Sequence, residues 1–183
     1  YVPIAVGTLN CQDLRMVAMV LLADENKIDI LAVQETHLMS RRDEMIGGPL
    51  DCVPDDDGLS TLPQTTRKYN VTLGAAHTTA DGGVVGGVGF IIRADWDAKV
   101  QIHGPRKATA VIQRTACSPA VFQNIYAPQN NEADEYQAFW TELEADPKRH
   151  VGDFNDGNDT ARAITEATLS RLGLKDAGIT RDA

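Results

Sequence analysis

The stretch Ile28-Asp29-Ile30-Leu31-Ala32-Val33 is a nearly unbroken apolar run, and it constrains the fold more than any other segment. Such runs are typical of strands buried on both faces of a sheet. A second apolar run, Ile4-Ala5-Val6-Gly7-Thr8-Leu9, precedes it. Between the two runs, apolar residues recur with helical spacing and predict a helix packed on a core through Leu14, Val17, Ala18, Leu21 and Leu22. The order strand, helix, strand predicts a βαβ unit whose strands are parallel neighbours.

The chain beyond residue 68 is rich in short apolar runs, which predict five strands: Tyr69–Ala75, Val88–Arg93, Ala98–His103, Ala108–Gln113 and Ala120–Tyr126. Their close spacing favours antiparallel pairing. The glycine-rich stretch between the first two, residues 81–87, matches no phosphate-binding glycine motif and predicts a hairpin connection. A βαβ opening followed by such a β-rich part favours an α/β sandwich over a doubly wound sheet.

Three further segments complete the outline. Residues 40–68 lack periodicity and predict a long surface excursion. A helical stripe of four apolar residues predicts a second core-packed helix, through Tyr136, Phe139, Trp140 and Leu143. A last helix is expected near residues 159–172, between Asn158 as N-cap and Gly173 at its C-terminal end.

The composition predicts one domain spanning residues 1–183, because 43% of the residues are hydrophobic and 23% are charged. No apolar run has the length of a membrane span and no signal peptide is recognisable, so we expect an intracellular protein without a membrane segment. Three cysteines without a CxxC pair predict neither a zinc knuckle nor a disulfide framework. Because the chain begins with Tyr1, we expect it to be part of a longer protein.

The net charge of −9 counts against a passive nucleic-acid binder, which gains affinity by neutralising phosphates with Lys and Arg. It is compatible with an enzyme whose acidic side chains hold a divalent cation that meets phosphate directly. Three basic pairs, Arg41-Arg42, Arg67-Lys68 and Arg106-Lys107, could form a DNA-facing patch, although such pairs are more often solvated surface.

Polar side chains stand where the first two predicted strands end. Glu35 follows the apolar run directly, at the position where carboxylates of α/β proteins face a ligand crevice. Asn10 ends the first strand, so parallel pairing would place it beside Glu35. Mg²⁺ is held by one or two carboxylates and several waters, and an amide suits a phosphate, a metal or a carboxylate. The alternatives are helix capping for Glu35 and the N-cap of the first helix for Asn10.

Asp153 and Asn155 form a second candidate pair near the end of the sequence. Strand alternation would place both on one face and Phe154 on the other. An acid and an amide together could orient an attacking water or stabilise a leaving oxygen. The alternative is an Asp/Asn/Gly turn, since residues 156–159 continue that composition.

Five motifs occur in the order found in the endonuclease/exonuclease/phosphatase (DNase I-like) superfamily, which the chain resembles over nearly its whole length. They are Thr8-Leu9-Asn10, Gln34-Glu35-Thr36, Gly87-Val88-Gly89-Phe90-Ile91-Ile92, Asn124-Ile125-Tyr126-Ala127-Pro128 and Gly152-Asp153-Phe154-Asn155. The sequence around Glu35, Tyr126 and Asp153 is most similar to that of the endonuclease domains of non-LTR (LINE-type) retrotransposons.

The resemblance implies a four-layer α/β sandwich and Mg²⁺-dependent phosphodiester cleavage of DNA, with Mn²⁺ as the alternative ion. By position it implies that Glu35 ligates the metal, with Asn10 as its neighbour. Tyr126 would contact the scissile phosphate or support the site. Asp153 would activate or orient the attacking water, and Asn155 would bind phosphate or stabilise the leaving group. A retrotransposon endonuclease would act in the nucleus.

The resemblance ends soon after Asp153. The family continues with strands that carry an acid and a Ser-Asp-His motif, whereas residues 154–183 contain no histidine. The stretch leading into Asp153, Pro147–Val151, is also short and charged. We therefore expect a C-terminally incomplete fold whose open sheet edge would be covered by a protein partner or another chain segment.

Three functions remain open from the sequence. The first is a DNA-nicking endonuclease of retrotransposon type. The second is a catalytically inactive, retroelement-derived module that serves a structural or protein-binding role. The third is a phosphatase or phosphodiesterase that acts on a lipid headgroup. The shared phosphate chemistry allows this function, but the retrotransposon-like sequence motifs disfavour it.

Overall fold

A computed structural model describes residues 3–12, 15–48, 65–113, 118–128, 133–144 and 149–153. The chain divides into two compact units, Tyr1–Tyr126 with Arg149–Asp153 and Ala127–Lys148 with Phe154–Ala183. In the second unit the structure describes one helix, α2 (Ala133–Glu144), as predicted. Its buried Trp140 contacts Tyr136 and Phe139 edge-on, at ring-centroid distances of 6.1 and 5.8 Å. The helix expected at residues 159–172 lies outside the described residues.

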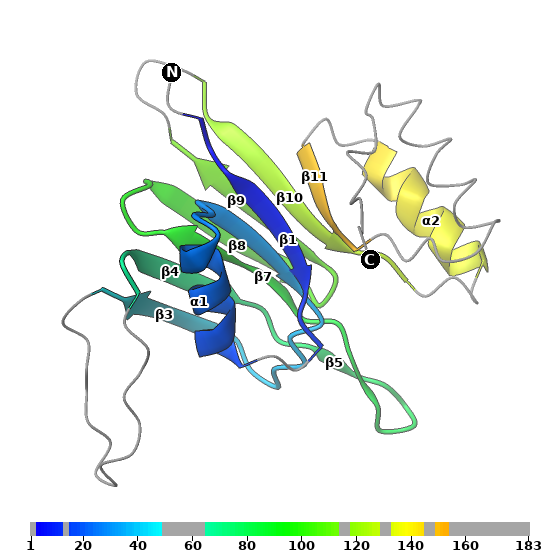
Figure 1. The fold of residues 1–183 in the computed structure, drawn as a ribbon. Helices are drawn as coiled ribbons and strands as arrows, with labels where there is room; N and C mark the ends of the chain where they lie inside the picture. The colour runs from blue at the N-terminus through cyan, green and yellow to red at the C-terminus, as the bar shows by residue number, and fades with distance from the viewer. Residues whose placement is uncertain are drawn as a thin grey trace, which may run out of the picture. The chain divides into compact units, whose positions relative to one another are not determined.

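The first unit contains two sheets packed face to face, with the helix α1 (Met16–Glu25) on the outer side of one of them (Figure 1). The large sheet follows the order β1 (Val6–Asn10), β2 (Ile30–Gln34), β7 (Val88–Arg93), β4 (Lys68–Leu73) and β3 (Arg42–Gly47). The small sheet follows the order β11 (Arg149–Asp153), β10 (Ala120–Tyr126), β9 (Lys107–Ile112) and β8 (Ala98–Gly104). A separate hairpin consists of β5 (His77–Thr78) and β6 (Val84–Val85).

The strand pairing confirms most of the sequence predictions. β1 and β2 are parallel with α1 between them in the chain, so the βαβ unit is confirmed. β4, β7, β8, β9 and β10 form at the five predicted places, and β4 with β7, β8 with β9, and β9 with β10 pair antiparallel. The glycine-rich stretch does contain a hairpin connection. The fold is therefore a mixed α/β arrangement of facing sheets, and the predicted fourth layer stays a prediction.

The buried face of α1 differs from the predicted one. Met19, Val20 and Ala23 are buried, whereas Leu22, a member of the predicted stripe, is 37% exposed. The helix sequence is apolar almost all the way round, so spacing alone does not select a face. The choice follows from the apolar surface that the large sheet offers, which includes Leu31, Val33, Tyr69, Val71, Leu73 and Ile91.

The predicted surface excursion over residues 40–68 contains a strand that periodicity did not indicate. β3 pairs antiparallel with β4 along its full length, at the edge of the large sheet. Four of its six residues are exposed and three of those are charged, and Asp43 pairs with the preceding Arg41 at 2.6 Å. Backbone hydrogen bonding to β4 therefore makes this strand, and charged side chains suit an edge position. Residues 49–64 lie outside the described residues.

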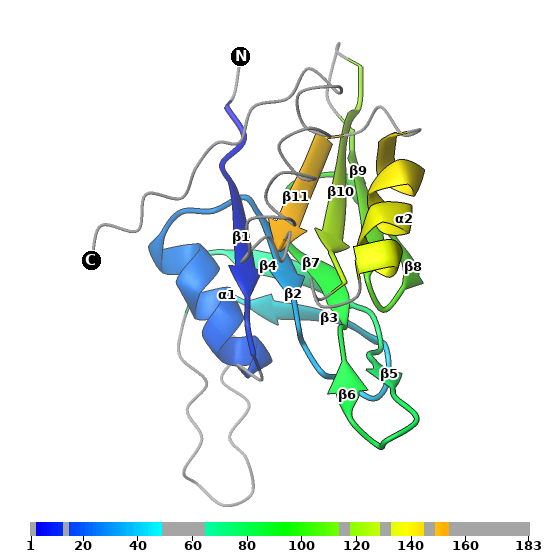
Figure 2. The ribbon, with the colours of Figure 1, turned by 90° about the vertical axis from the view of Figure 1, so that its right-hand side faces the viewer.

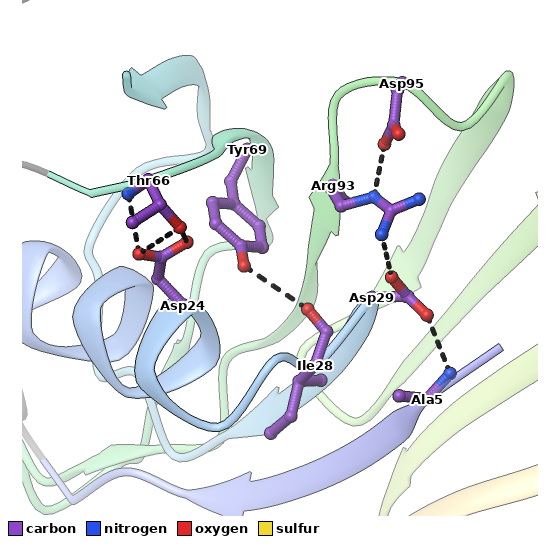
Figure 3. A network of polar contacts seen from close by, with 8 residues as sticks. All are labelled: Ala5, Asp24, Ile28, Asp29, Thr66, Tyr69, Arg93 and Asp95. Atoms are coloured by element: carbon purple, nitrogen blue, oxygen red, sulfur yellow. Dashed lines mark hydrogen bonds and ion pairs between the residues drawn. The ribbon is translucent and has the colours of Figure 1, made fainter. Parts of the chain in front are cut away.

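A polar network holds the strand ends that lie farthest from Asn10 and Glu35 (Figure 3). The buried Asp29 carboxylate, just before β2, accepts a hydrogen bond from the Ala5 N–H at 2.8 Å. Arg93, at the end of β7, pairs with Asp29 at 2.7 Å and with Asp95 at 2.5 Å. The Asp95 hydrogen bond raises the pKa of Arg93. The network ties β1, β2 and β7 together at this end, and a buried charge is tolerated because it is paired.

The C-terminal end of α1 is a Schellman motif with a lysine at the left-handed position. The Ile28 N–H donates to the Ala23 carbonyl at 2.9 Å, and the Lys27 N–H donates to the Asp24 carbonyl at 3.1 Å. Lys27 has φ +55°, a conformation that glycine adopts without the Cβ penalty.

We expect Lys27→Gly to raise the free energy of unfolding by about 0.5–1 kcal/mol, because relief at φ +55° exceeds the entropy that glycine adds to the unfolded chain. Urea unfolding measures the change. Lys27→Ala is the matched control, since it removes the same charge and keeps the Cβ. An equal gain in both variants would show that charge, rather than backbone strain, is responsible.

The helices of the described part of the chain include none with the length and apolar character needed to cross a membrane.

Candidate functional site

Four strands of the first unit end at the same edge, and three of the predicted site residues occupy the last positions of those strands. β1 and β2 run parallel in the large sheet, with Asn10 opposite Gln34, so Asn10 lies beside the strand end that leads into Glu35. β10 and β11 run parallel in the small sheet, with Tyr126 opposite Asp153. β1 packs near β11 and β2 near β10. Figure 2 shows the arrowheads of all four strands pointing the same way.

A side-chain hydrogen bond joins the two sheets at this edge. The Tyr126 hydroxyl donates to Oε1 of Glu35. Tyr126 is buried, whereas Glu35 is partly exposed, so the carboxylate has one oxygen held by the protein while the residue still reaches solvent. Glu35 also has φ +55°, which is unusual for a residue with a Cβ and turns the chain out of β2. Strained backbone of this kind concentrates at functional sites.

A buried pair of amides lies one residue before Glu35 and two before Tyr126. The Gln34 Nε2 donates to the Asn124 Oδ1 at 2.7 Å, across the interface between the sheets. The Asn124 Nδ2 donates to the carbonyls of Val33 at 2.9 Å and Gly89 at 2.7 Å. The Gln34 Oε1 accepts from the Thr8 hydroxyl at 3.2 Å. This amide bridge fixes β2 relative to β10, and therefore the spacing between Glu35 and Tyr126.

Two glycines hold the segment that follows Glu35. The Thr36 N–H donates to the Gly87 carbonyl at 3.2 Å, and the His37 N–H donates to the Gly86 carbonyl at 3.3 Å. The Gly87 N–H in turn donates to the Pro105 carbonyl at 2.8 Å. Gly86 and Gly87 both have left-handed φ angles, +79° and +88° respectively. A Cβ on Gly87 would lie 2.3 Å from the Thr36 Oγ1. Only glycine allows this close approach.

Arg106 completes the surroundings of Tyr126. It lies in the turn between β8 and β9, and its carbonyl accepts the Tyr126 N–H at 2.9 Å. Its guanidinium carbon is 5.3 Å from the centre of the Tyr126 ring, within the range of a cation–π contact. A positive charge therefore lies over the ring whose hydroxyl holds Glu35.

The donor set at this edge suits a hard divalent cation. Glu35 offers a carboxylate oxygen, and Asn10 beside it offers an amide oxygen. Within the part of the chain that the structure describes, no three His, Cys, Asp or Glu side chains gather to hold an ion by themselves. Mg²⁺ needs only one or two carboxylates, because it keeps several waters and binds substrate phosphate. The oxygen donors of Glu35 and Asn10 thus fit Mg²⁺ or Mn²⁺ better than a soft metal.

The structure brings Asn10, Glu35 and Tyr126 together and places the backbone of Asp153 opposite Tyr126. The charged stretch before Asp153 does form a strand, β11, despite its composition. Asn155 lies outside the described residues, so its proposed role stays a prediction. β11 has only β10 as a paired neighbour among the described strands.

Sequence reasoning missed the supporting residues of the site. Gln34 and Asn124 belong to the quoted motifs, yet they received no role of their own. Their signal was a polar side chain inside a largely apolar strand, which must find a partner when it is buried. Arg106 was noted only as half of a basic pair. Nothing in its local sequence indicates that its guanidinium lies over Tyr126, because that contact joins a turn to a strand distant in the chain.

Comparison with known proteins supports the fold. No protein-family model and no curated protein matches the sequence. Among solved structures, an AP endonuclease from Archaeoglobus fulgidus is similar at a TM-score of 0.51 and 14% sequence identity. The similarity covers 92% of this chain and 70% of the AP endonuclease. The chain therefore shares the DNase I-like fold of that AP endonuclease, and at this identity the likeness concerns the fold alone.

Proposed function

We propose that this chain is a divalent-metal-dependent phosphodiesterase domain that nicks DNA, most similar in its motifs to the endonucleases of LINE-type retrotransposons. The observation that carries the proposal is the hydrogen bond from Tyr126 to Glu35, which joins the two sheets where four strands end. In α/β proteins, ligands bind where the carboxyl ends of strands meet. A partly exposed carboxylate held at that edge can therefore serve as the ligand of a divalent cation. The fold shared with an AP endonuclease agrees with this chemistry.

Glu35 and Asn10 would hold the ion, and Tyr126 would keep the Glu35 carboxylate in place. Bound Mg²⁺ would offset the negative charge of a phosphate oxygen. Asp153 would orient a water molecule and take up its proton as the water oxygen bonds to phosphorus. The bond from phosphorus to the leaving oxygen would break, and Asn155 would donate a hydrogen bond to that oxygen.

A nicking assay on supercoiled plasmid tests the proposal. We expect open-circular DNA to form with Mg²⁺ or Mn²⁺ and not with EDTA. Phosphoinositide-containing vesicles assayed for phosphate release cover the alternative substrate, a lipid headgroup. An intact plasmid at every metal concentration, with a correctly folded chain, would contradict the proposal.

A second candidate function is a non-catalytic module of the same fold. The observation that favours it is the net charge of −9, because a protein that binds nucleic acid gains affinity by neutralising phosphates with Lys and Arg. Such a module would bind a protein partner along an open sheet edge. If both this chain and a version extended at its C-terminus leave plasmid intact, and a defined partner binds stably, the non-catalytic function is supported.

A further inference from the structure

We propose that Arg106 is a positioning residue for the Glu35–Tyr126 pair, an inference whose catalytic part depends on the proposed phosphodiesterase function. Tyr126 has two distinct contacts with Arg106. The Tyr126 N–H donates to the Arg106 carbonyl at 2.9 Å, and the Arg106 guanidinium carbon lies 5.3 Å from the ring centre. The first contact holds the backbone of Tyr126, and the second restricts its ring.

The position of Arg106 is itself determined by the glycine segment. Pro105, directly before Arg106, accepts the Gly87 N–H at 2.8 Å. A Cβ on Gly86 would lie 2.6 Å from the Pro105 carbonyl oxygen, so the two backbones are in close contact. Gly87 in turn accepts the N–H of Thr36, the residue after Glu35.

These contacts close a loop around the site. The Thr36 N–H donates to the Gly87 carbonyl, the Gly87 N–H donates to the Pro105 carbonyl, and the Tyr126 N–H donates to the carbonyl of Arg106, the residue after Pro105. The Tyr126 hydroxyl then donates a hydrogen bond to Glu35, the residue before Thr36. Besides Glu35, Arg106 is the member of this loop that contacts Tyr126 through its side chain, because the links from Thr36 to Gly87 and from Gly87 to Pro105 are backbone hydrogen bonds. A planar guanidinium can lie against an aromatic face, whereas the compact lysine ammonium cannot replace that stacking.

The contact between Arg106 and Tyr126 therefore affects the orientation of the Glu35 carboxylate. If the Tyr126 ring is free to tilt, its hydroxyl no longer holds Oε1 of Glu35 in one place. A displacement of about 1 Å at a reacting centre lowers turnover by about 10²-fold. Arg106→Lys keeps the positive charge near the DNA and loses the stacking, so the loss should fall on kcat. A cation that only attracts phosphate would affect KM instead.

The experiment compares Arg106→Lys and Arg106→Gln with Lys107→Gln, which removes one positive charge from the adjacent residue. Nicking kinetics give kcat and KM. Carbon-13 labelled tyrosine gives an NMR signal for each of the four tyrosine rings, and Tyr126→Phe identifies the signal of Tyr126. We expect both Arg106 variants to shift and broaden that signal and Lys107→Gln to leave it in place. We also expect Arg106→Lys to lower kcat by about 10–100-fold with KM within about threefold.

The two measurements separate this inference from the proposed function. An unmoved Tyr126 signal in both Arg106 variants, or a loss in Arg106→Lys confined to KM, overturns the positioning role. If the wild-type chain does not nick DNA, the phosphodiesterase proposal fails. The NMR comparison still decides whether Arg106 holds Tyr126.

Discussion

Glu35→Gln lowers the rate of metal-dependent DNA nicking by about 10²–10³-fold while the fold is retained. The substitution keeps the length of the side chain, and the amide oxygen can still accept a hydrogen bond from the Tyr126 hydroxyl. The free energy of unfolding should therefore change by less than about 1 kcal/mol. What is lost is the negative charge that would hold Mg²⁺ or Mn²⁺ at the end of β2.

The measurement is the initial rate of plasmid nicking over a range of Mg²⁺ concentrations, together with the Mn²⁺ dissociation constant from electron paramagnetic resonance. Glu44→Gln is the matched control, because Glu44 is an exposed acid on the edge strand β3. It removes the same charge, and we expect wild-type values from it. Wild-type nicking and Mn²⁺ affinity in Glu35→Gln would show that Glu35 is not the metal ligand.

Asn124→Leu destabilises the protein by about 3–4 kcal/mol, the largest stability effect that we predict. Leucine has a similar volume but cannot make the three hydrogen bonds of the Asn124 amide, to Gln34, Val33 and Gly89. All of these bonds are buried, so water does not replace them in the folded state. The amide of Gln34 would lose its acceptor inside the interface between the sheets.

Urea unfolding followed by circular dichroism measures the loss, and the double variant Gln34→Leu/Asn124→Leu is its control. Removing both amides avoids leaving either one buried without the other, so the double variant should cost less than the sum of the two single variants. Additive losses would mean that the two side chains act independently. A loss below about 1 kcal/mol in Asn124→Leu would contradict the role of the amide bridge.

Much of the fold could be predicted because its strands are short and their boundaries are marked in the sequence. The boundaries of β7 and β10 coincide with the predicted runs, since both strands are largely buried and their apolar residues end where burial ends. β3 was missed for the opposite reason. Four of its six residues are exposed and three of those are charged, and its structure comes from backbone pairing with β4, which leaves no apolar pattern.

Helix α1 shows a different limit. Its position follows from an apolar run between two strands, but its packing face does not. Since nearly every side of the helix is apolar, several stripes satisfy the spacing equally well. The large sheet selects Met19, Val20 and Ala23, and it leaves Leu22 partly exposed.

For the candidate site, the sequence by itself determined which polar residues stand at strand ends. Asn10, Glu35 and Tyr126 follow or end apolar strands, and parallel pairing of β1 with β2 brings the first two together. The tertiary structure alone decided how the two sheets meet. The Tyr126–Glu35 hydrogen bond, the Gln34–Asn124 bridge and the Arg106 contact each join residues from different elements. Sequence periodicity reports burial along one element, whereas these contacts depend on the register between elements, which only the packed sheets determine.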